Sequence, residues 1–284
     1  MADIKGREIK VHEHGFVRVV DTMGDDAAIV QAARVSYGEG TKTVNEDAGL
    51  LKYLMKHKHS SPFEMNEIKI HVKLPIFVAR QWIRHRTANV NEVSGRYSVL
   101  PSEYYTPDTW HAQSKDNKQG SGEALDAELQ GRKSHGYWSL MMDTFEWYER
   151  SGDRLAREQA RMVLPLSTYT EMYWKIDLSN LFHFLRLRAD GHAQKEIRDY
   201  ADAISSLVEE WCPLAFAAWV EYQRDAVTLS AGQVEMVKAL VKHLELTQPA
   251  YSIGDVPDTA STFLAHKAGS ISRRDRQELE KLFA

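Results

Sequence analysis

Apolar and polar residues alternate along several short stretches of the chain, most strictly over residues 67–74. Every second residue there is aliphatic, from Ile68 to Leu74, and the residues between them are charged or polar. A period of two residues is typical of a strand with one buried face. Weaker patterns of the same kind predict strands over residues 9–11, 16–21 and 168–177.

Apolar residues spaced three or four positions apart predict helices between and after these strands. Pro75 opens one of them, which runs to about His85, because proline suits the first turn of a helix. The other helices are predicted over residues 25–37, 45–57, 123–151, from 153 to before 165, 179–188, 192–211 and 212–222, and polar loops over 87–98 and 101–122. The predicted fold class is α+β, or mixed α/β: an antiparallel or mixed sheet flanked by long helices.

The pattern changes after Arg224. A further helix is predicted over residues 230–244, a linker rich in Pro and Gly over 249–257, and a charged helix from residue 270. The sequence therefore predicts a main domain over residues 1–222 and a helical C-terminal extension over residues 223–284.

The composition is that of a globular protein. Of its 284 residues, 43% are hydrophobic, and no apolar run approaches the roughly 18 residues of a membrane-spanning helix. The charged N-terminus has no apolar segment of a secretory signal. The single cysteine, Cys212, excludes an internal disulfide and lies in an apolar stretch, so we expect it in the core. These features predict a cytoplasmic protein with no membrane partner.

Charge is unevenly distributed along the chain. The net charge of −4 argues against general affinity for nucleic acid. Residues 73–96 nevertheless hold five basic residues and one acidic residue, a local charge of +4. A compact basic segment in an acidic chain suits a small anionic ligand better than a polymer.

Arg84, His85 and Arg86 follow each other within this basic segment, before a loop with several hydrogen-bonding side chains. Three such residues in succession cannot all face solvent from one side of a helix, so some are expected to point into the loop. Gly95 lets a backbone approach closely there, and arginine matches the geometry of phosphate. The alternative is an ordinary helix C-terminus, which cations also favour. The residues alone leave both interpretations open.

The series Arg84-His85-Arg86, seven residues and then Ser94 resembles the RHR-x7-S signature of the flavin-dependent thymidylate synthases. Further stretches resemble that family in one consistent order, at residues 57–64, 75–82, 91–97, 160–166 and 187–194. The resemblance implies an enzyme of dTMP biosynthesis, a methyltransferase that converts dUMP to dTMP. Methylenetetrahydrofolate would donate the carbon, and FAD reduced by NADPH would donate the hydride.

The resemblance also implies which residues bind the nucleotide. For dUMP they are Gln81, Trp82, Ile83, Arg84, Glu92, Val93, Ser94, Gly95, Arg96, Arg161 and Arg188. Arg188 is the expected catalytic residue, because a fixed cation at the uracil edge stabilises negative charge that develops on the ring. Its alternative is an ion pair with Asp190. For Arg161, which follows Arg157 and Arg154 by four and seven residues, the alternative is a solvated ladder on one helix face.

The cofactor contacts are implied in the same way. FAD is expected at Ser61, Arg84, His85, Arg86, Glu92, Asp177, Leu178, Ser179 and His183. His59 is a candidate for the folate or NADPH pocket, and no metal is expected. The family assembles as a homotetramer with shared active sites, so the loop around Ser94 and Arg161 need not meet within one chain.

Two other classes of protein fit parts of the sequence. A nucleotide- or nucleic-acid-binding protein could use the basic segment, although such proteins spread charge and stacking aromatics along a face. A metallohydrolase could use His12 and His14, or His57 and His59. Histidines two residues apart point to different sides of a helix, however, and no His-Glu-x-x-His motif occurs. For Ser94, phosphate binding is preferred to nucleophilic attack because no adjacent base is evident.

Overall fold

The computed structural model describes residues 3–35, 44–115, 120–151 and 154–238. The chain divides into two compact units, residues 1–226 and 227–284. In the second unit, residues 231–238 are helical, within the helix predicted over 230–244. The rest of that helix, the predicted linker and the terminal helix lie outside the described residues. Within the described ranges, no helix has both the length and the apolarity needed to cross a membrane.

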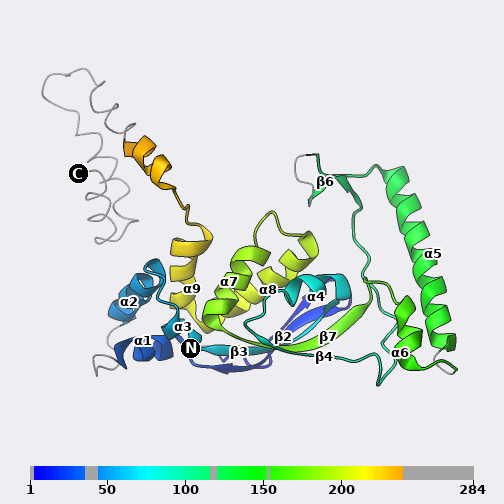
Figure 1. Ribbon diagram of the computed structural model, residues 1–284, viewed down its shortest axis with the longest axis horizontal. Coiled ribbons are helices and arrows are strands. Elements are labelled where there is room, and N and C mark those ends of the chain that lie inside the picture. Colours follow the sequence, from blue (N-terminus) through cyan, green and yellow to red (C-terminus); the bar gives the residue numbers. More distant parts are fainter. Residues whose placement is uncertain (1–2, 36–43, 116–119, 152–153, 239–284) are drawn as a thin grey trace, which may run out of the picture. The chain divides into compact units, whose positions relative to one another are not determined.

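A five-stranded antiparallel sheet is the centre of the first unit (Figure 1). In order across the sheet, its strands are β1 (Glu8–Val11), β2 (Gly15–Met23), β3 (Glu67–Pro75), β7 (Tyr169–Asp177) and β4 (Asn89–Glu92). The mixed α/β fold with an antiparallel sheet is confirmed. The four strands predicted from the alternation of apolar residues are confirmed as β1, β2, β3 and β7.

Strand β4 corrects the sequence prediction, which placed a loop over residues 87–98. All four of its side chains are exposed, so its sequence has no alternation of buried and exposed residues. The strand forms because its backbone pairs with β7, from Asn89 opposite Lys175 to Glu92 opposite Met172. It is therefore an edge strand that depends on its neighbour.

Three helices cover one face of the sheet: α4 (Ile76–Trp82), α7 (Leu178–Arg188) and α8 (Lys195–Trp211) (Figure 1). Alternate residues of β3 and β7 are buried beneath them, among them the cross-strand pair Ile70 and Trp174. Trp82, the last residue of α4, packs edge-on against Trp174 with ring centroids 5.2 Å apart, and both side chains are fully buried. Burial of these large rings fixes the end of α4 on the sheet.

The remaining helices are α1 (Asp26–Arg34), α2 (Val44–Lys56), α3 (Ser61–Glu64), α5 (Ala127–Ser151), α6 (Arg157–Ala160) and α9 (Pro213–Trp219), with a 3-10 turn η2 (Arg161–Val163) and a π-helical turn η3 (Val220–Arg224). Some ends differ from the prediction. Helix α4 stops before His85, and α8 begins after His192, whose backbone N–H donates to the Asp190 carboxylate in a turn. The predicted loop over residues 101–122 contains strand β5 (His111–Gln113), which pairs with β6 (Ser121–Ala124).

Helix α5 packs around a small hydrophobic cluster of its own. Met141, Phe145 and Tyr148 are the buried residues of this helix, and they gather with Ala160 of α6. The rest of α5 is half-buried or exposed. Because α6 leads into η2, this small cluster fixes the position of Arg161.

Candidate active site

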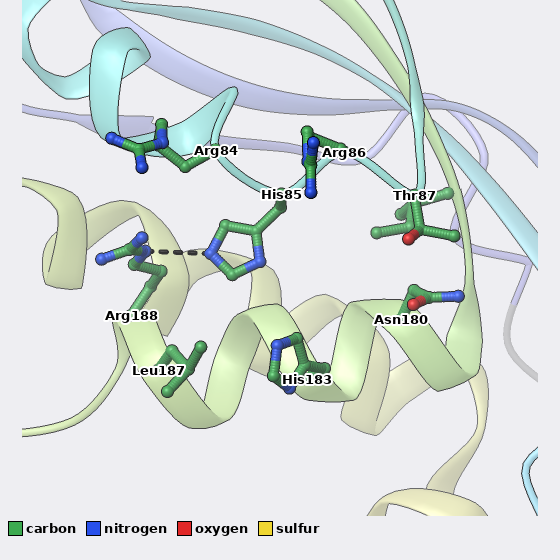
Figure 2. A pocket seen from close by; sticks show the side chains of 9 residues that line it. Arg84, His85, Arg86, Thr87, Asn180, His183, Leu187 and Arg188 are labelled. Atoms are coloured by element: carbon green, nitrogen blue, oxygen red, sulfur yellow. Dashed lines mark hydrogen bonds between the residues drawn. The ribbon is translucent and has the colours of Figure 1, made fainter.

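A cavity of about 310 Å³ lies between the chain that follows α4 and the outer face of α7 (Figure 2). It is rich in hydrogen-bond donors and has no acidic side chain. Its lining residues are Arg84, His85, Arg86, Thr87, Ile176, Asn180, His183, Leu187 and Arg188.

The two walls of the cavity are fixed by helix ends. On one side α4 ends at Trp82, and the chain turns out of the helix so that the next residues face α7. On the other side the Asp177 carboxylate caps α7 by accepting a hydrogen bond from the backbone N–H of Asn180. Asn180, His183 and Leu187 then follow at helical spacing and share one face of α7.

A hydrogen bond joins the two walls. The Arg188 Nε–H donates to Nε2 of His85 over 3.0 Å, and an Nη2–H donates to the backbone carbonyl of Gln81 over 3.4 Å (Figure 2). Because a guanidinium has only donors, His85 Nε2 must carry a lone pair, and the imidazole proton is on Nδ1. The predicted alternative, an ion pair between Arg188 and Asp190, does not form. Asp190 instead pairs with His192 over 2.8 Å.

Positive charge is concentrated at this cavity. Arg84 and Arg86 are exposed beside half-buried Arg188, and within the described ranges none of the three has a carboxylate partner. Burial lowers the pKa of His85 to about 4, with further contributions from Arg188 and His183. Burial and then Arg84 also lower the pKa of Arg188. Because cations held together without a counter-charge repel each other, this arrangement favours binding of an anion.

A second polar group lies just beyond β4 and contains the phosphate-binding residues predicted from the sequence. A Cβ placed on buried Gly95 would lie 3.3 Å from Cδ of Arg161, so the loop and this arginine are in contact. Ser94 Oγ accepts a hydrogen bond from the backbone N–H of Arg96 over 3.4 Å. The loop around Ser94 and Arg161 therefore meet within one chain.

The arginines around α6 do not form the one-face ladder that was the alternative role of Arg161. Helix α6 begins at Arg157, so Arg154 lies outside it and lines a separate cavity against α5. Arg157 donates a hydrogen bond to the backbone carbonyl of Tyr97 and thereby holds the loop that follows Ser94. This leaves Arg161 as the member of the series that lies against Gly95.

The two groups of candidate residues lie at opposite ends of β4. Arg86 and Thr87 come shortly before this strand, and Val93 to Arg96 come directly after it. At about 3.4 Å per residue, a four-residue strand separates them by roughly 14 Å. Glu92, which the family resemblance assigned to both dUMP and FAD, lies at the second end and accepts a hydrogen bond from Thr170 Oγ1 over 2.7 Å.

The other candidate residues are not among those that line the cavity. The side chains of Trp82 and Leu178 are fully buried in the core. Gln81 donates to the Gln194 side chain over 2.5 Å. Of the remaining candidates, Ile83 is the C-cap residue of α4, Ser61 begins α3, Ser179 lies in the first turn of α7, and exposed His59 lies near the ring of Tyr53.

The histidine pairs considered for a metal site have other contacts. His12 pairs with Asp199 over 2.9 Å, and the rings of His57 and His59 lie 6.4 Å apart. Among the residues that the structure describes, no three His, Cys, Asp or Glu side chains are arranged to hold a metal ion.

Four residues of the cavity were missed by the sequence analysis: Thr87, Ile176, Asn180 and Leu187. The spacing of Asn180 and Leu187 around His183 is the signal that could have found two of them, since all three share a face of α7. Thr87 and Ile176 give no such signal, because only the pairing of β4 with β7 brings them together.

Solved structures of nucleotide methylases share this fold. The crystal structure of a UMP/dUMP methylase, PolB from Streptomyces cacaoi, bound with 5-Br UMP has a TM-score of 0.68 and 31% identity, and the match covers 76% of this chain and 98% of that one. The same protein bound with 5-Br dUMP also has a TM-score of 0.68, at 34% identity over 76% of this chain and 99% of that one.

Sequence comparison gives the family. The model of the thymidylate synthase complementing protein family matches residues 18–214. A flavin-dependent thymidylate synthase of Wolbachia pipientis wMel is 54% identical over 253 residues, covering 87% of this chain and 88% of that protein. The enzyme of the same name from Ruegeria pomeroyi is 56% identical over 245 residues, 84% of this chain and 81% of that protein. The chain therefore belongs to the flavin-dependent thymidylate synthase family, which confirms the resemblance and the prediction of an enzyme.

Proposed function

We propose that this enzyme methylates dUMP to dTMP at a site built from the two polar groups at the ends of β4. Methylenetetrahydrofolate is the carbon donor and NADPH the source of reducing equivalents. The observation that carries the proposal is a cavity lined by Arg84, Arg86 and Arg188 and by no acidic side chain. This cavity occurs in a chain that belongs to the flavin-dependent thymidylate synthase family. Such a site selects anionic ligands, and the nucleotide, the flavin and the folate are all anions.

The chemistry of the cavity fits FAD. Arg84, Arg86, Thr87, Asn180 and His183 offer cationic and hydrogen-bonding groups that suit a pyrophosphate and ribose hydroxyls. When bound, FAD supplies the hydride for the reaction. The cavity volume of about 310 Å³ is at the low end of the ~300–1,000 Å³ of small-molecule sites, so we propose that one chain provides only part of the flavin site.

The second group is proposed to hold the phosphate of dUMP. Arg96 and Arg161 supply two positive charges, and the Ser94 hydroxyl and the backbone N–H of Gly95 supply neutral donors. The contact between Gly95 and Arg161 supports a compact cradle, because the missing side chain leaves room for the arginine. Phosphate binding needs no activated hydroxyl, which agrees with the preference for Ser94 as a binding residue.

Arg188 is proposed to act on the uracil ring. Negative charge develops on the ring as C5 becomes nucleophilic, and a fixed cation beside it stabilises that charge more than it stabilises the ground state. Partial burial of Arg188 strengthens the interaction, because the local dielectric constant is lower than in water. Exposed His59 stays a candidate for the folate or NADPH pocket.

A homotetramer with shared sites is the assembly we propose. In one chain the two polar groups are separated by the length of β4. In a tetramer, the cavity of one subunit could lie beside the Ser94 and Arg161 group of another subunit, and the two groups would then form one site. Large apolar side chains are exposed along α5, in η2 and shortly after η2: Trp138 (54%), Leu140 (59%), Met162 (78%) and Leu166 (62%). Contiguous exposed apolar surface is typical of protein interfaces, so we propose these side chains as candidates for the subunit contacts.

The proposed division of the chain places the whole reaction in residues 1–222, with residues 223–284 as an extension. Cytoplasm is the proposed compartment. The single cysteine is a free buried thiol, and free thiols are typical of proteins in a reducing compartment.

The test is a flavin spectrum taken on the purified protein. We expect the protein to show flavin absorbance, which NADPH should bleach under anaerobic conditions. Addition of dUMP and methylenetetrahydrofolate should then restore the absorbance while dTMP forms. A matched reaction without dUMP should form no dTMP. A colourless protein that neither takes up added FAD nor forms dTMP would overturn the proposal.

A further inference from the structure

We propose that His85 is a positioning residue for Arg188, whose guanidinium it orients by accepting the Nε–H on Nε2. The inference goes beyond binding of FAD by the Arg84-His85-Arg86 segment, and it rests on the proposed role of Arg188 at the uracil ring.

Geometry supports this role. A guanidinium has five N–H donors, and two of those of Arg188 are used, one on His85 Nε2 at 3.0 Å and one on the Gln81 carbonyl at 3.4 Å. Two acceptors on different atoms fix both the position and the rotation of the planar group. The remaining donors are on the Nη atoms and stay available to a ligand in the cavity that Arg188 lines.

The imidazole is itself held in place. Its ring meets the buried ring of Phe184 in an edge-on contact at 4.9 Å, and the ring of His183 lies 5.8 Å away. In Figure 2 the His85 ring lies between the backbone of its own segment and α7, with Nε2 turned to Arg188. A ring fixed by packing can act as a fixed acceptor.

His85 can accept this hydrogen bond only while it is neutral. The charged and titratable groups around it are Arg84 and Arg86 on its own segment and His183 and Arg188 on α7. A positive charge on any of these groups disfavours a further positive charge on His85. Partial burial is the largest cause, and together with Arg188 and His183 it lowers the pKa of His85 to about 4. The acceptor is therefore present throughout the neutral pH range.

A neutral acceptor has an advantage over a carboxylate in this place. Aspartate or glutamate would also orient Arg188, but its charge would cancel much of the field that the guanidinium exerts on the ligand. A neutral imidazole orients the arginine and leaves its full charge directed at the cavity. The central histidine of the motif thus acts on the nucleotide through Arg188.

The test compares two amide variants that differ in where they place an acceptor. In His85→Gln the amide oxygen can reach the position of Nε2, whereas in His85→Asn it reaches only that of Nδ1. Losing a hydrogen bond to a charged group should lower kcat for dTMP formation about 10- to 100-fold in His85→Asn. His85→Gln should recover most of that loss, and KM for dUMP should change less than kcat in both. Equal kcat values for the two variants, with flavin content matched to wild type, would overturn the proposal.

A second measurement does not depend on activity. The ¹⁵N chemical shifts of His85 should show a protonated Nδ1 and an unprotonated Nε2 at neutral pH, and in Arg188→Ala the Nε2 shift should move. A protonated Nε2 in the wild type would overturn the positioning role even if dTMP is formed. If the wild type forms no dTMP but shows the expected tautomer, the proposed function fails while the His85–Arg188 contact stands.

Discussion

Gly95 lies directly against Arg161, and a Cβ at position 95 would come within 3.3 Å of the arginine Cδ. Such a distance is tight, and Leu100 Cδ1 lies equally close to the same point. The absence of a side chain at residue 95 therefore allows the loop and the arginine to share one small space.

We expect Gly95→Ala to weaken dUMP binding without unfolding the protein. The added methyl group would push against Arg161, whose flexible side chain can move, so the fold should tolerate the change while the phosphate cradle is displaced. The expected loss is about tenfold in affinity, or roughly 1.4 kcal/mol, as measured by calorimetric titration with dUMP. Gly136→Ala is the matched control, because a Cβ there meets nothing within 4 Å. Unchanged dUMP affinity in Gly95→Ala would contradict the role of this contact.

The stability of the enzyme should fall with acid in a way that depends on His85. The unfolded chain protonates this imidazole near its ordinary pKa of 6.5, whereas the folded chain does so only near pH 4. Between these values the unfolded state binds more protons, so stability is lost as the pH falls from 6.5 towards 4, and no change comes from His85 above 6.5.

Thermal unfolding of wild type and His85→Gln, compared from pH 7.5 to 5, checks this expectation. The variant cannot titrate at position 85, so its melting temperature should fall less over that range. Parallel pH profiles of the two proteins would show that the folded pKa of His85 is not depressed.

Much of the fold could be predicted because burial leaves a period in the sequence. Strand β3 is buried on one face along its whole length, so the residues from Ile68 to Leu74 alternate and reveal it. Strand β4 has four exposed side chains and depends on β7 for its hydrogen bonds, so no period marks it. Local pattern thus identifies elements that bury a face and misses those that exist only through pairing.

The candidate site likewise contains residues that could be predicted from the sequence and contacts that could not. The resemblance to the family identified Arg84, His85 and Arg188 as candidates, but the hydrogen bond between the last two joins residues that are far apart in the chain. The end of α4 is set by burial of Trp82 against another strand, which the sequence cannot show, and the predicted helix therefore ran too far. The contact of Gly95 with Arg161 likewise requires the folded chain.

Cys212 should be unreactive and dispensable for catalysis. Its side chain is fully buried, burial raises the pKa of the thiol, and nearby Asp26 raises it further. Because the thiolate is the reactive form, iodoacetamide should label the native enzyme very slowly at pH 8 and modify one residue after unfolding in urea. Cys212→Ala should keep kcat within about twofold per folded enzyme, since an inert core thiol takes no part in the reaction. Rapid labelling of the native enzyme, or loss of turnover with FAD retained, would show that the thiol is chemically active.

Arg188→Ala should abolish most turnover while the enzyme keeps its flavin. The substitution removes the cation proposed to stabilise charge on the uracil ring, and removal of one such group typically lowers kcat about 100- to 1,000-fold. Arg186→Ala is the matched control, because Arg186 is exposed on the same helix and does not line the cavity. Single-turnover formation of dTMP, followed beside the flavin absorbance of each variant, separates lost chemistry from lost cofactor. A near-normal rate in Arg188→Ala would show that Arg188 does not stabilise the charge on the ring. An equal loss of rate in both variants would show that the effect comes from the total positive charge of α7 and is not specific to Arg188.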